Sequence, residues 1–338
     1  MRIAVNGFGR IGRIFLRRII LNPAIEVVAI NDLSDTETLA HLFKYDSVHR
    51  IFNGTVSADT GNLYINGKQI KVLSEKDPSK LPWKELDIDL VIESTGKFTS
   101  KQCAEQHLIA GAKQVIISAP SADKDVPTVV IGVNDESIDL HSPIISNASC
   151  TTNNVAAMVK ILDDNWGIID GYITTVHSMT GDQSLHDAPH KDLRRARAAS
   201  ASIIPTTTGA AKAITRIFPH LAGKLGGAGI RVPVLNGSLT DFTCSLKKQP
   251  TVEEINRAFK QAADGPMKNV LEYTEDPIVS TDILGNQHSC IFDSKLTSIV
   301  GGLVKIVGWY DNEMGYSSRL ADLVEKISVL KHDQVYSD

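Results

Sequence analysis

The residues best suited to chemistry in this chain surround Cys150, in the stretch 146–153 with the sequence SNASCTTN. This stretch follows the apolar run 143–145 and precedes apolar residues at helical spacing in 155–162. The pattern predicts a strand, a tight turn and a helix, with Cys150 in the first helical turn. There, unpaired backbone N–H groups and the positive end of the helix dipole would favour the thiolate, which is the nucleophilic form of cysteine. Free cysteines are often buried structural residues, but the hydroxyls on both sides of Cys150 favour a catalytic site.

A histidine that could accept the thiol proton is His177, at the end of the alternating segment 172–177. A Cys–His pair supplies both a nucleophile and a base. The alternative is a packed or solvated histidine, because the sequence does not show that the two side chains meet. His186 and His190 have the spacing of metal ligands on a helix, but Pro189 between them disfavours a helix. We therefore expect no metal site.

Several stretches are suited to binding an anion. Arg231 lies in the strand-like stretch 230–232, where a charge needs a partner. The hydroxyl run 206–208 opens an alanine-rich helix, a geometry that suits phosphate. The arginines of the stretch 194–197 fit either a solvated charged face or an anion site. A nucleic-acid surface is disfavoured by the net charge of −4.

A dinucleotide site is predicted near the N-terminus. A strand-like run leads into a G-x-G-x-x-G turn formed by Gly7, Gly9 and Gly12, and a helical pattern follows. Asp32 ends the next apolar run, at the spacing of the dinucleotide-binding fingerprint. The glycines permit a tight turn and close approach of a pyrophosphate, and Asp32 would accept hydrogen bonds from a ribose and repel a 2′-phosphate. A glycine turn without a ligand is the alternative.

The first part of the chain is typical of a Rossmann-like α/β domain. Unalternated apolar runs indicate a largely parallel sheet covered on both faces. These runs are 90–93, 115–118, 129–131 and 144–145. Turn signals within 33–88 suggest a hairpin insertion.

The pattern of apolar residues changes after residue 148. Apolar and polar residues alternate there, which indicates an α+β domain with a mostly antiparallel sheet. In that domain 299–309 is interpreted as one glycine-interrupted strand, and the loop 178–202 is long enough to indicate a functional role. A final helix is expected over 317–330, with Ser317 or Ser318 as its N-cap.

The composition agrees with an enzyme of the cytoplasm. The chain has 338 residues, 42% of them apolar, and four dispersed cysteines, which suits a reducing compartment. We expect no signal peptide and no transmembrane segment, because no apolar run reaches membrane-spanning length. Neither a membrane nor a nucleic-acid partner is expected.

Together these motifs resemble the phosphorylating glyceraldehyde-3-phosphate dehydrogenase family along essentially the full chain. The motifs are the glycine turn, 149–153, the His177 segment, 192–197, Thr208-Gly209 and 309–313. The resemblance implies a dinucleotide-binding domain of residues 1–148, completed by the C-terminal helix 313–338, and a catalytic domain of residues 149–312. It also implies a homotetramer in which the loop 178–202 lies at a subunit interface.

The implied reaction is the NAD-dependent oxidative phosphorylation of D-glyceraldehyde 3-phosphate to 1,3-bisphosphoglycerate, a step of glycolysis and gluconeogenesis. Cys150 would form a hemithioacetal and then a thioester that inorganic phosphate releases, with His177 as the base. By resemblance, the cofactor contacts are Gly7, Gly9, Arg10, Ile11, Gly12, Asp32, Lys76, Ser118 and Asn312. Those for the substrate phosphate are Thr180, Asp182, Arg195 and Arg231, and those for the attacking phosphate are Ser149, Thr151, Thr208 and Gly209.

Some positions depart from the family pattern. Asn154 stands where many members have a second cysteine, and Met179 where a tyrosine or threonine is common. Lys76 stands where an arginine is usual and Ala188 where strictly NAD-using members have a leucine, so the strictness of the NAD preference is left open. Two other functions also remain open. One is erythrose-4-phosphate dehydrogenase, disfavoured by the threonine–glycine pairs at 180–181 and 208–209, and the other is a non-catalytic binding protein on the same scaffold.

Overall fold

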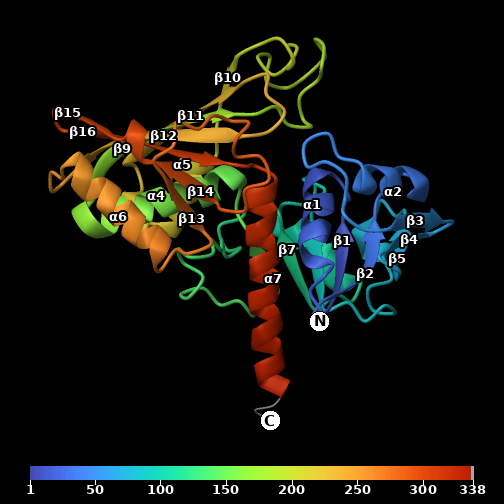
Figure 1. The fold of residues 1–338 in the computed structure, drawn as a ribbon. Coiled ribbons are helices and arrows are strands. Elements are labelled where there is room, and N and C mark those ends of the chain that lie inside the picture. The colour runs from blue at the N-terminus through green and yellow to red at the C-terminus, as the bar shows by residue number, and fades with distance from the viewer. Residues whose placement is uncertain (336–338) are drawn as a thin grey trace. The chain divides into compact units, whose positions relative to one another are not determined.

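The structure, a computed structural model, describes residues 1–335 and divides into two compact units (Figure 1). The first unit comprises residues 1–129, 135–148 and the chain from Ser317 onward. The second comprises residues 130–134 and 149–316. Each unit is built around its own sheet of eight strands.

The first unit has a mostly parallel sheet in the order β3-β4-β5-β2-β1-β6-β7-β8, in which the neighbours from β5 to β8 all pair in parallel. Its strands are β1 (Arg2–Asn6), β2 (Glu26–Asn31), β3 (Val56–Asp59), β4 (Asn62–Ile65), β5 (Lys68–Leu73), β6 (Leu90–Glu93), β7 (Gln114–Ile117) and β8 (Ile144–Ser146). Its helices are α1 (Arg10–Ile19), α2 (Thr36–Lys44), the short η1 (Pro78–Lys80) and α3 (Lys101–Ile109). The expected hairpin insertion is present as β3 and β4, which extend this sheet through β5.

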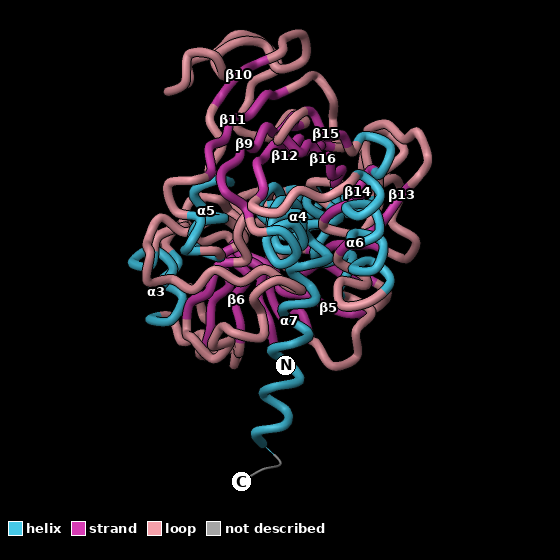
Figure 2. The backbone as a smooth tube through the Cα atoms, turned by 90° about the vertical axis from the view of Figure 1, so that its left-hand side faces the viewer, coloured by secondary structure: helices cyan, strands magenta, loops and turns pink. Residues whose placement is uncertain are grey.

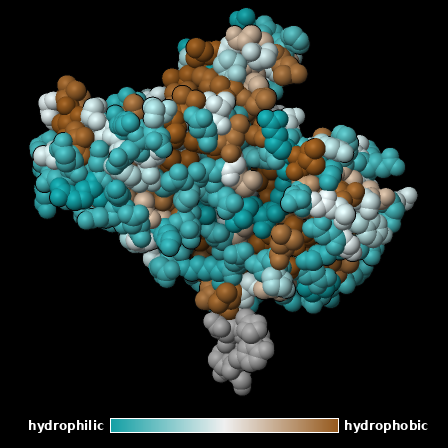
Figure 3. All heavy atoms as spheres, in the orientation of Figure 1, coloured by the Kyte–Doolittle hydropathy of each residue, from teal (hydrophilic) through white to brown (hydrophobic). Residues whose placement is uncertain are grey.

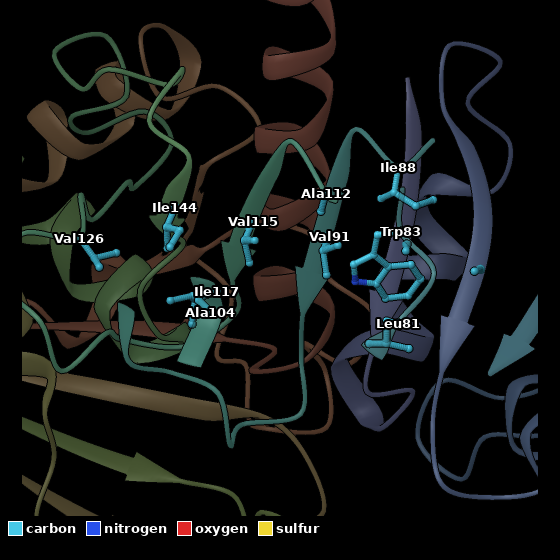
Figure 4. Close-up of a cluster of buried hydrophobic side chains, with 12 residues drawn as sticks. Leu81, Trp83, Ile88, Val91, Ala104, Ala112, Val115, Ile117, Val126 and Ile144 are labelled. Carbon is cyan, nitrogen blue, oxygen red and sulfur yellow. The ribbon is translucent and has the colours of Figure 1, made fainter. Parts of the chain in front are cut away.

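The core of the first unit is apolar because strands buried on both faces contribute side chains in both directions. One cluster brings together Trp83, Ile88, Val91, Val115 and Ile144 (Figure 4). Trp83 is fully buried although it lies outside the strands. This apolar core fixes the positions of the strands and therefore of the polar residues at their carboxyl ends.

The expected strand at 129–131 is absent. Only Thr128 forms an isolated bridge, with Ser146. The carbonyl of Val130 accepts hydrogen bonds from the N–H groups of Val133 and Asn134, and Gly132 has a φ of 78°. The chain therefore turns at this point, and an apolar run alone did not reveal the turn.

The second unit has a mostly antiparallel sheet in the order β10-β11-β9-β12-β16-β14-β13, with β15 paired to β16. Its strands are β9 (Ile168–His177), β10 (Ile204–Thr206), β11 (Leu225–Arg231), β12 (Ser238–Leu246), β13 (Leu271–Thr274), β14 (Cys290–Asp293), β15 (Ser298–Val300) and β16 (Leu303–Tyr310). Its helices are α4 (Cys150–Trp166), α5 (Ala210–Ile217), η2 (Pro219–Leu221), α6 (Val252–Asp264) and η3 (Ser294–Leu296). Residues 178–203 form a long loop between β9 and β10 (Figure 2).

Two further expectations need correction. The segment 299–309 is not one strand but the antiparallel pair β15 and β16, because Gly301, with a φ of 58°, forms the turn between them. The last helix, α7 (Met314–Val335), begins before Ser317. Asp311 caps it instead, since its Oδ1 accepts hydrogen bonds from the backbone N–H groups of Glu313 and Met314.

Candidate active site

The thiol of Cys150 and the imidazole of His177 meet in the second unit, with 3.5 Å between Sγ and Nε2. Cys150 is the first residue of α4, as expected, and Ser149 caps the helix by accepting a hydrogen bond from the Thr152 N–H. The chain then reverses at Gly167, which has a φ of 71°. At ~1.5 Å per residue the 17-residue helix is about 25 Å long, and at ~3.3 Å per residue the 10-residue β9 is about 33 Å long. The strand is therefore long enough to return His177 to the start of the helix.

Two neighbours compete for the other imidazole nitrogen of His177. Nδ1 lies 2.8 Å from the Ser178 carbonyl oxygen and also contacts Nη1 of Arg231. When Nδ1–H donates to the Ser178 carbonyl, Nε2 has a free lone pair facing Cys150. Arg231 retains a partner in that arrangement, since its Nη1 lies 3.1 Å from the same carbonyl. This tautomer is the one that can take a proton from the thiol.

Burial is the largest influence on the acidity of both groups. It raises the pKa of the Cys150 thiol, against the opposing influence of the Arg231 charge and the Thr151 N–H. Burial and then the Arg231 charge lower the pKa of His177 from 6.5 to about 3. Both shifts favour a thiol beside a neutral imidazole in the free protein. The sequence-based expectation of a lowered thiol pKa is wrong for the free protein. It rested on the helix N-terminus alone, and the effect of burial is larger.

The arginines form a cationic site beside this pair. Arg231 ends β11 directly beside His177 in the parallel register of β11 and β9. Arg195 reaches the same region from the long loop, with its Nη1 2.8 Å from Asp182 Oδ2 and its Nε donating to the Thr206 hydroxyl. Thr180 also hydrogen-bonds to Asp182. Arg231 also interacts electrostatically with Asp182 and Arg195, so the structure groups all four residues expected around a substrate phosphate.

The other anion candidates also belong to the second unit. Thr208 and Gly209 lie at the start of α5, where the Thr208 hydroxyl accepts a hydrogen bond from the Ala210 N–H. Arg197 is largely exposed and pairs with Asp187. It therefore belongs to a solvated face.

A pocket of about 500 Å³ lies in the first unit, at the carboxyl ends of its parallel strands. Gly7, Gly9, Asp32 and Lys76 line it. A Cβ added at Gly7, where φ is 92°, would lie 2.7 Å from the Thr95 nitrogen, so only glycine fits this turn. Asp32 is held at the pocket wall by hydrogen bonds from the N–H groups of Phe8 and Ser34.

These features fit the adenosine and pyrophosphate of a dinucleotide. Arg10 and Ile11 begin α1, where Arg10 forms an ion pair with Asp46 at 2.6 Å. Ser118 follows β7, and its N–H donates to the Glu93 carbonyl. Asn312 belongs to the second unit, where its Oδ1 accepts hydrogen bonds from the hydroxyls of Ser178 and Ser238.

Comparison with known proteins identifies the family. A model described as "Glyceraldehyde 3-phosphate dehydrogenase, NAD binding domain" matches residues 1–101, and the corresponding C-terminal domain model matches residues 149–312. The chain belongs to the glyceraldehyde-3-phosphate dehydrogenase family. Glyceraldehyde-3-phosphate dehydrogenase of Thermotoga maritima is 56% identical over 327 residues, covering 96% of this chain and 98% of the relative. The enzyme of Streptomyces coelicolor is 55% identical over 327 residues (96% and 97%), and that of Geobacillus stearothermophilus is 52% identical over 330 residues (97% and 98%). The resemblance inferred from the motifs is confirmed.

Sequence reasoning missed one residue next to Cys150 and His177. The hydroxyl of Tyr310 lies 2.9 Å from the Thr151 hydroxyl and 2.8 Å from the Thr175 hydroxyl, and all three groups are buried. The edge of its ring faces the ring of His177 at 6.0 Å between centroids. Tyr310 thus links α4, β9 and β16 beneath the pair. Its place in the motif 309–313 was the only sequence signal.

Among residues 1–335, no group of three or more His, Cys, Asp or Glu side chains is placed to hold a metal ion. No helix within these residues is long and apolar enough to cross a membrane.

Proposed function

We propose that this protein is a phosphorylating glyceraldehyde-3-phosphate dehydrogenase, which oxidises D-glyceraldehyde 3-phosphate with NAD and inorganic phosphate to 1,3-bisphosphoglycerate. The reaction belongs to glycolysis and, in reverse, to gluconeogenesis. The observation that carries the proposal is the contact of 3.5 Å between Cys150 Sγ and His177 Nε2, with Arg231 beside them. This arrangement joins a nucleophile, a base and a cation that can hold a phosphorylated substrate.

In the first step, Cys150 Sγ attacks the aldehyde carbon while its proton passes to Nε2 of His177. The N–H groups at the start of α4 stabilise the developing oxyanion. His177 returns its proton to this oxyanion, which gives the hemithioacetal hydroxyl, and takes that proton back as a hydride leaves the same carbon. NAD, when bound, supplies the hydride acceptor. The product of this oxidation is a thioester on Cys150, which retains the energy needed to form an acyl phosphate.

In the second step, an oxygen of inorganic phosphate attacks the thioester carbon and Cys150 leaves as a thiolate. We assign the binding of this phosphate to Ser149, Thr151, Thr208 and Gly209. The phosphate of the substrate is assigned to Thr180, Asp182, Arg195 and Arg231. Asp182 orients Arg195 and Thr180 through the hydrogen bonds described above. A substrate phosphate next to Arg231 also offsets the charge that lowers the pKa of His177, so substrate binding makes this residue a stronger base.

The residues assigned to NAD are Gly7, Gly9, Arg10, Ile11, Gly12, Asp32, Lys76, Ser118 and Asn312. The size of the pocket and the two hydrogen bonds that fix Asp32 support this assignment. Asp32 would accept hydrogen bonds from a ribose and repel a 2′-phosphate, so NAD is preferred to NADP.

Initial rates test this function directly. We expect rapid reduction of NAD with glyceraldehyde 3-phosphate only when phosphate or arsenate is present, and much slower reduction with erythrose 4-phosphate. Faster turnover of erythrose 4-phosphate would assign the protein to the sister activity. Tight binding of NAD without turnover of either aldehyde would indicate a binding protein on the same scaffold.

The assembly we propose is a homotetramer of a cytoplasmic enzyme. Apolar side chains gather on the surface over the strands of the second unit (Figure 3). Three apolar residues of this unit in or next to its strands are exposed, namely Ile169, Ile203 and Leu303. The long loop adds Leu185 and Leu193, which are 67% and 81% exposed. Patches of this kind commonly mark protein interfaces. Light scattering during size-exclusion chromatography measures the number of subunits, and a monomer would contradict this part of the proposal.

A further inference from the structure

A buried polar network lies behind the dinucleotide pocket, and the mechanism above does not use it. Its centre is the carboxylate of Glu93, which is 1% exposed at the carboxyl end of β6. Oε1 accepts hydrogen bonds from the N–H of Thr95 at 2.8 Å and from the Thr95 hydroxyl at 2.5 Å. Oε2 accepts from Asn6 Nδ2 at 2.6 Å and lies 3.1 Å from Nε2 of His107. A buried carboxylate needs such partners, because removing it from water is otherwise costly.

The position of the hydrogen on His107 follows from its other neighbour. Nε1 of Trp83 donates to Nδ1 of His107 at 3.0 Å. An indole nitrogen can only donate, so Nδ1 carries no hydrogen and Nε2–H must donate to Glu93. Trp83 and His107 are both completely buried, and Trp83 belongs to the apolar cluster of Figure 4. The network is therefore anchored in the core of the first unit.

The other end of the network is the pocket wall. Asn6, Asn31 and Thr95 all line the pocket, and Asn6 Oδ1 accepts a hydrogen bond from Asn31 Nδ2 at 2.7 Å. The backbone of Thr95 packs against the glycine turn so closely that a Cβ at Gly7 would lie 2.7 Å from its nitrogen. Glu93 thus holds both the side-chain floor of the pocket and the segment that the glycine turn touches.

We propose that Glu93 and His107 are positioning residues for the dinucleotide site. They act through Asn6, Asn31 and Thr95, and they fix the distance between the glycine turn and the end of β6. This inference rests on the proposed use of NAD. It extends the site to side chains that the cofactor does not reach.

The main test is Glu93→Gln in the full-length protein, with NAD binding measured by calorimetry. The new amide has the shape of the carboxylate, but its NH₂ group must face either the Thr95 N–H or the donors of Asn6 and His107. We expect the Kd for NAD to rise about ten-fold, which corresponds to about 1.4 kcal/mol. The KM for NAD should rise in parallel, while kcat at saturating NAD and the KM for the aldehyde stay close to their unmodified values.

A matched control is Gln114→Leu, at the opposite end of the same sheet. Gln114 is equally buried, and its Nε2 donates to the carbonyls of Leu140 and Ser142. This change should lower the melting temperature without altering the Kd for NAD. If Glu93→Gln does not fold, His107→Leu carries the test, because it removes one donor from Glu93 and should weaken NAD binding in the same direction.

A second change separates positioning from general destabilisation. Trp83→Phe frees His107 to move its hydrogen to Nδ1, so Nε2 can accept from the amide of Glu93→Gln. This removes one of the two donor–donor conflicts and leaves the one with Asn6 Nδ2 in place. We expect the double variant to bind NAD more tightly than Glu93→Gln alone. Unchanged NAD affinity in a folded Glu93→Gln or His107→Leu variant, or losses that simply add in the double variant, would overturn the inference. Failure of the unmodified protein to bind NAD would instead overturn the proposed function.

Discussion

Replacing Arg231 by glutamine should shift the pKa values of Cys150 and His177 in the same direction. Burial has the largest influence on Cys150 and His177, and this substitution leaves it in place. The Arg231 charge lowers the pKa of the thiol by stabilising its anion, and it lowers the pKa of His177 by opposing the imidazolium. Removing the charge therefore raises both pKa values. Arg231 is partly exposed, so solvent screens part of this effect.

The assay is the rate of alkylation of Cys150 by iodoacetamide between about pH 5 and pH 10. Only the thiolate reacts, so a higher thiol pKa slows the reaction below the midpoint, and we expect a loss of rate on the order of ten-fold. Iodoacetamide is neutral, so its encounter with the thiol does not depend on the charge being removed. A phosphate monoester that lacks an aldehyde, such as glycerol 3-phosphate, should produce the same shift in the unmodified enzyme and little further shift in Arg231→Gln.

The control is Arg197→Gln, whose guanidinium is 66% exposed and pairs with Asp187. It removes the same charge from the chain without touching Cys150 or His177, so its alkylation profile should match that of the unmodified enzyme. A midpoint that stays in place or moves down in a folded Arg231→Gln variant would refute the reasoning, because the charge would then not reach the thiol.

Three other predictions follow from the site. Cys150→Ser should abolish dehydrogenation. In the unmodified enzyme without phosphate, a quenched reaction should trap a thioester on Cys150. A label on Cys103, Cys290 or Cys244 would contradict the mechanism, and Cys244 is an unfavourable nucleophile because burial raises its pKa to about 12. His177→Asn should slow the reaction on the order of 10²–10⁴-fold. Compared with the unmodified protein, the same variant should lose less stability on acidification between pH 6.5 and about 3. In that range the unfolded chain protonates His177 and the folded protein does not. Urea denaturation at a series of pH values measures the free energy of unfolding, and an unchanged dependence of that free energy on pH would contradict the lowered pKa. Asp32→Gly should narrow the preference for NAD over NADP in kcat/KM, whereas equal use of both cofactors by the unmodified enzyme would contradict the role of Asp32.

Features that depend on a few neighbouring residues were predictable from the sequence. The glycine turn at Gly7 and the helix start at Cys150 are set by backbone φ and by the unpaired N–H groups of one helical turn. The two sheet types followed from the difference between continuous and alternating apolar runs. Local pattern failed at 129–131, where the positive φ of Gly132 turns an apolar run out of the sheet.

Features that depend on tertiary packing were not predictable in the same way. The meeting of Cys150 and His177 depends on the relative lengths of α4 and β9. The pKa values of both groups depend on burial, which cannot be predicted from the residues near Cys150 in the sequence. Tyr310 reaches Thr151 from 159 positions away, and His107 reaches Glu93 from a different element of the first unit. Such contacts exist only once the sheets have formed.

The return of β9 along α4 also limits which changes in chain length the enzyme can tolerate. Cys150 and His177 are 27 positions apart on one continuous helix–strand segment. One residue inserted into α4 would rotate the preceding turn by about 100° relative to the rest of the helix. One residue inserted into β9 would move every later side chain of that strand to the opposite face of the sheet. The loop 178–202 carries no such constraint on its own register, and lengthening it costs little entropy. Insertions and deletions between Gly167 and His177 should therefore separate the base from the thiol while leaving both residues in the sequence. Insertions into the loop should be tolerated only where they leave the contacts of Ser178, Asp182 and Arg195 in place.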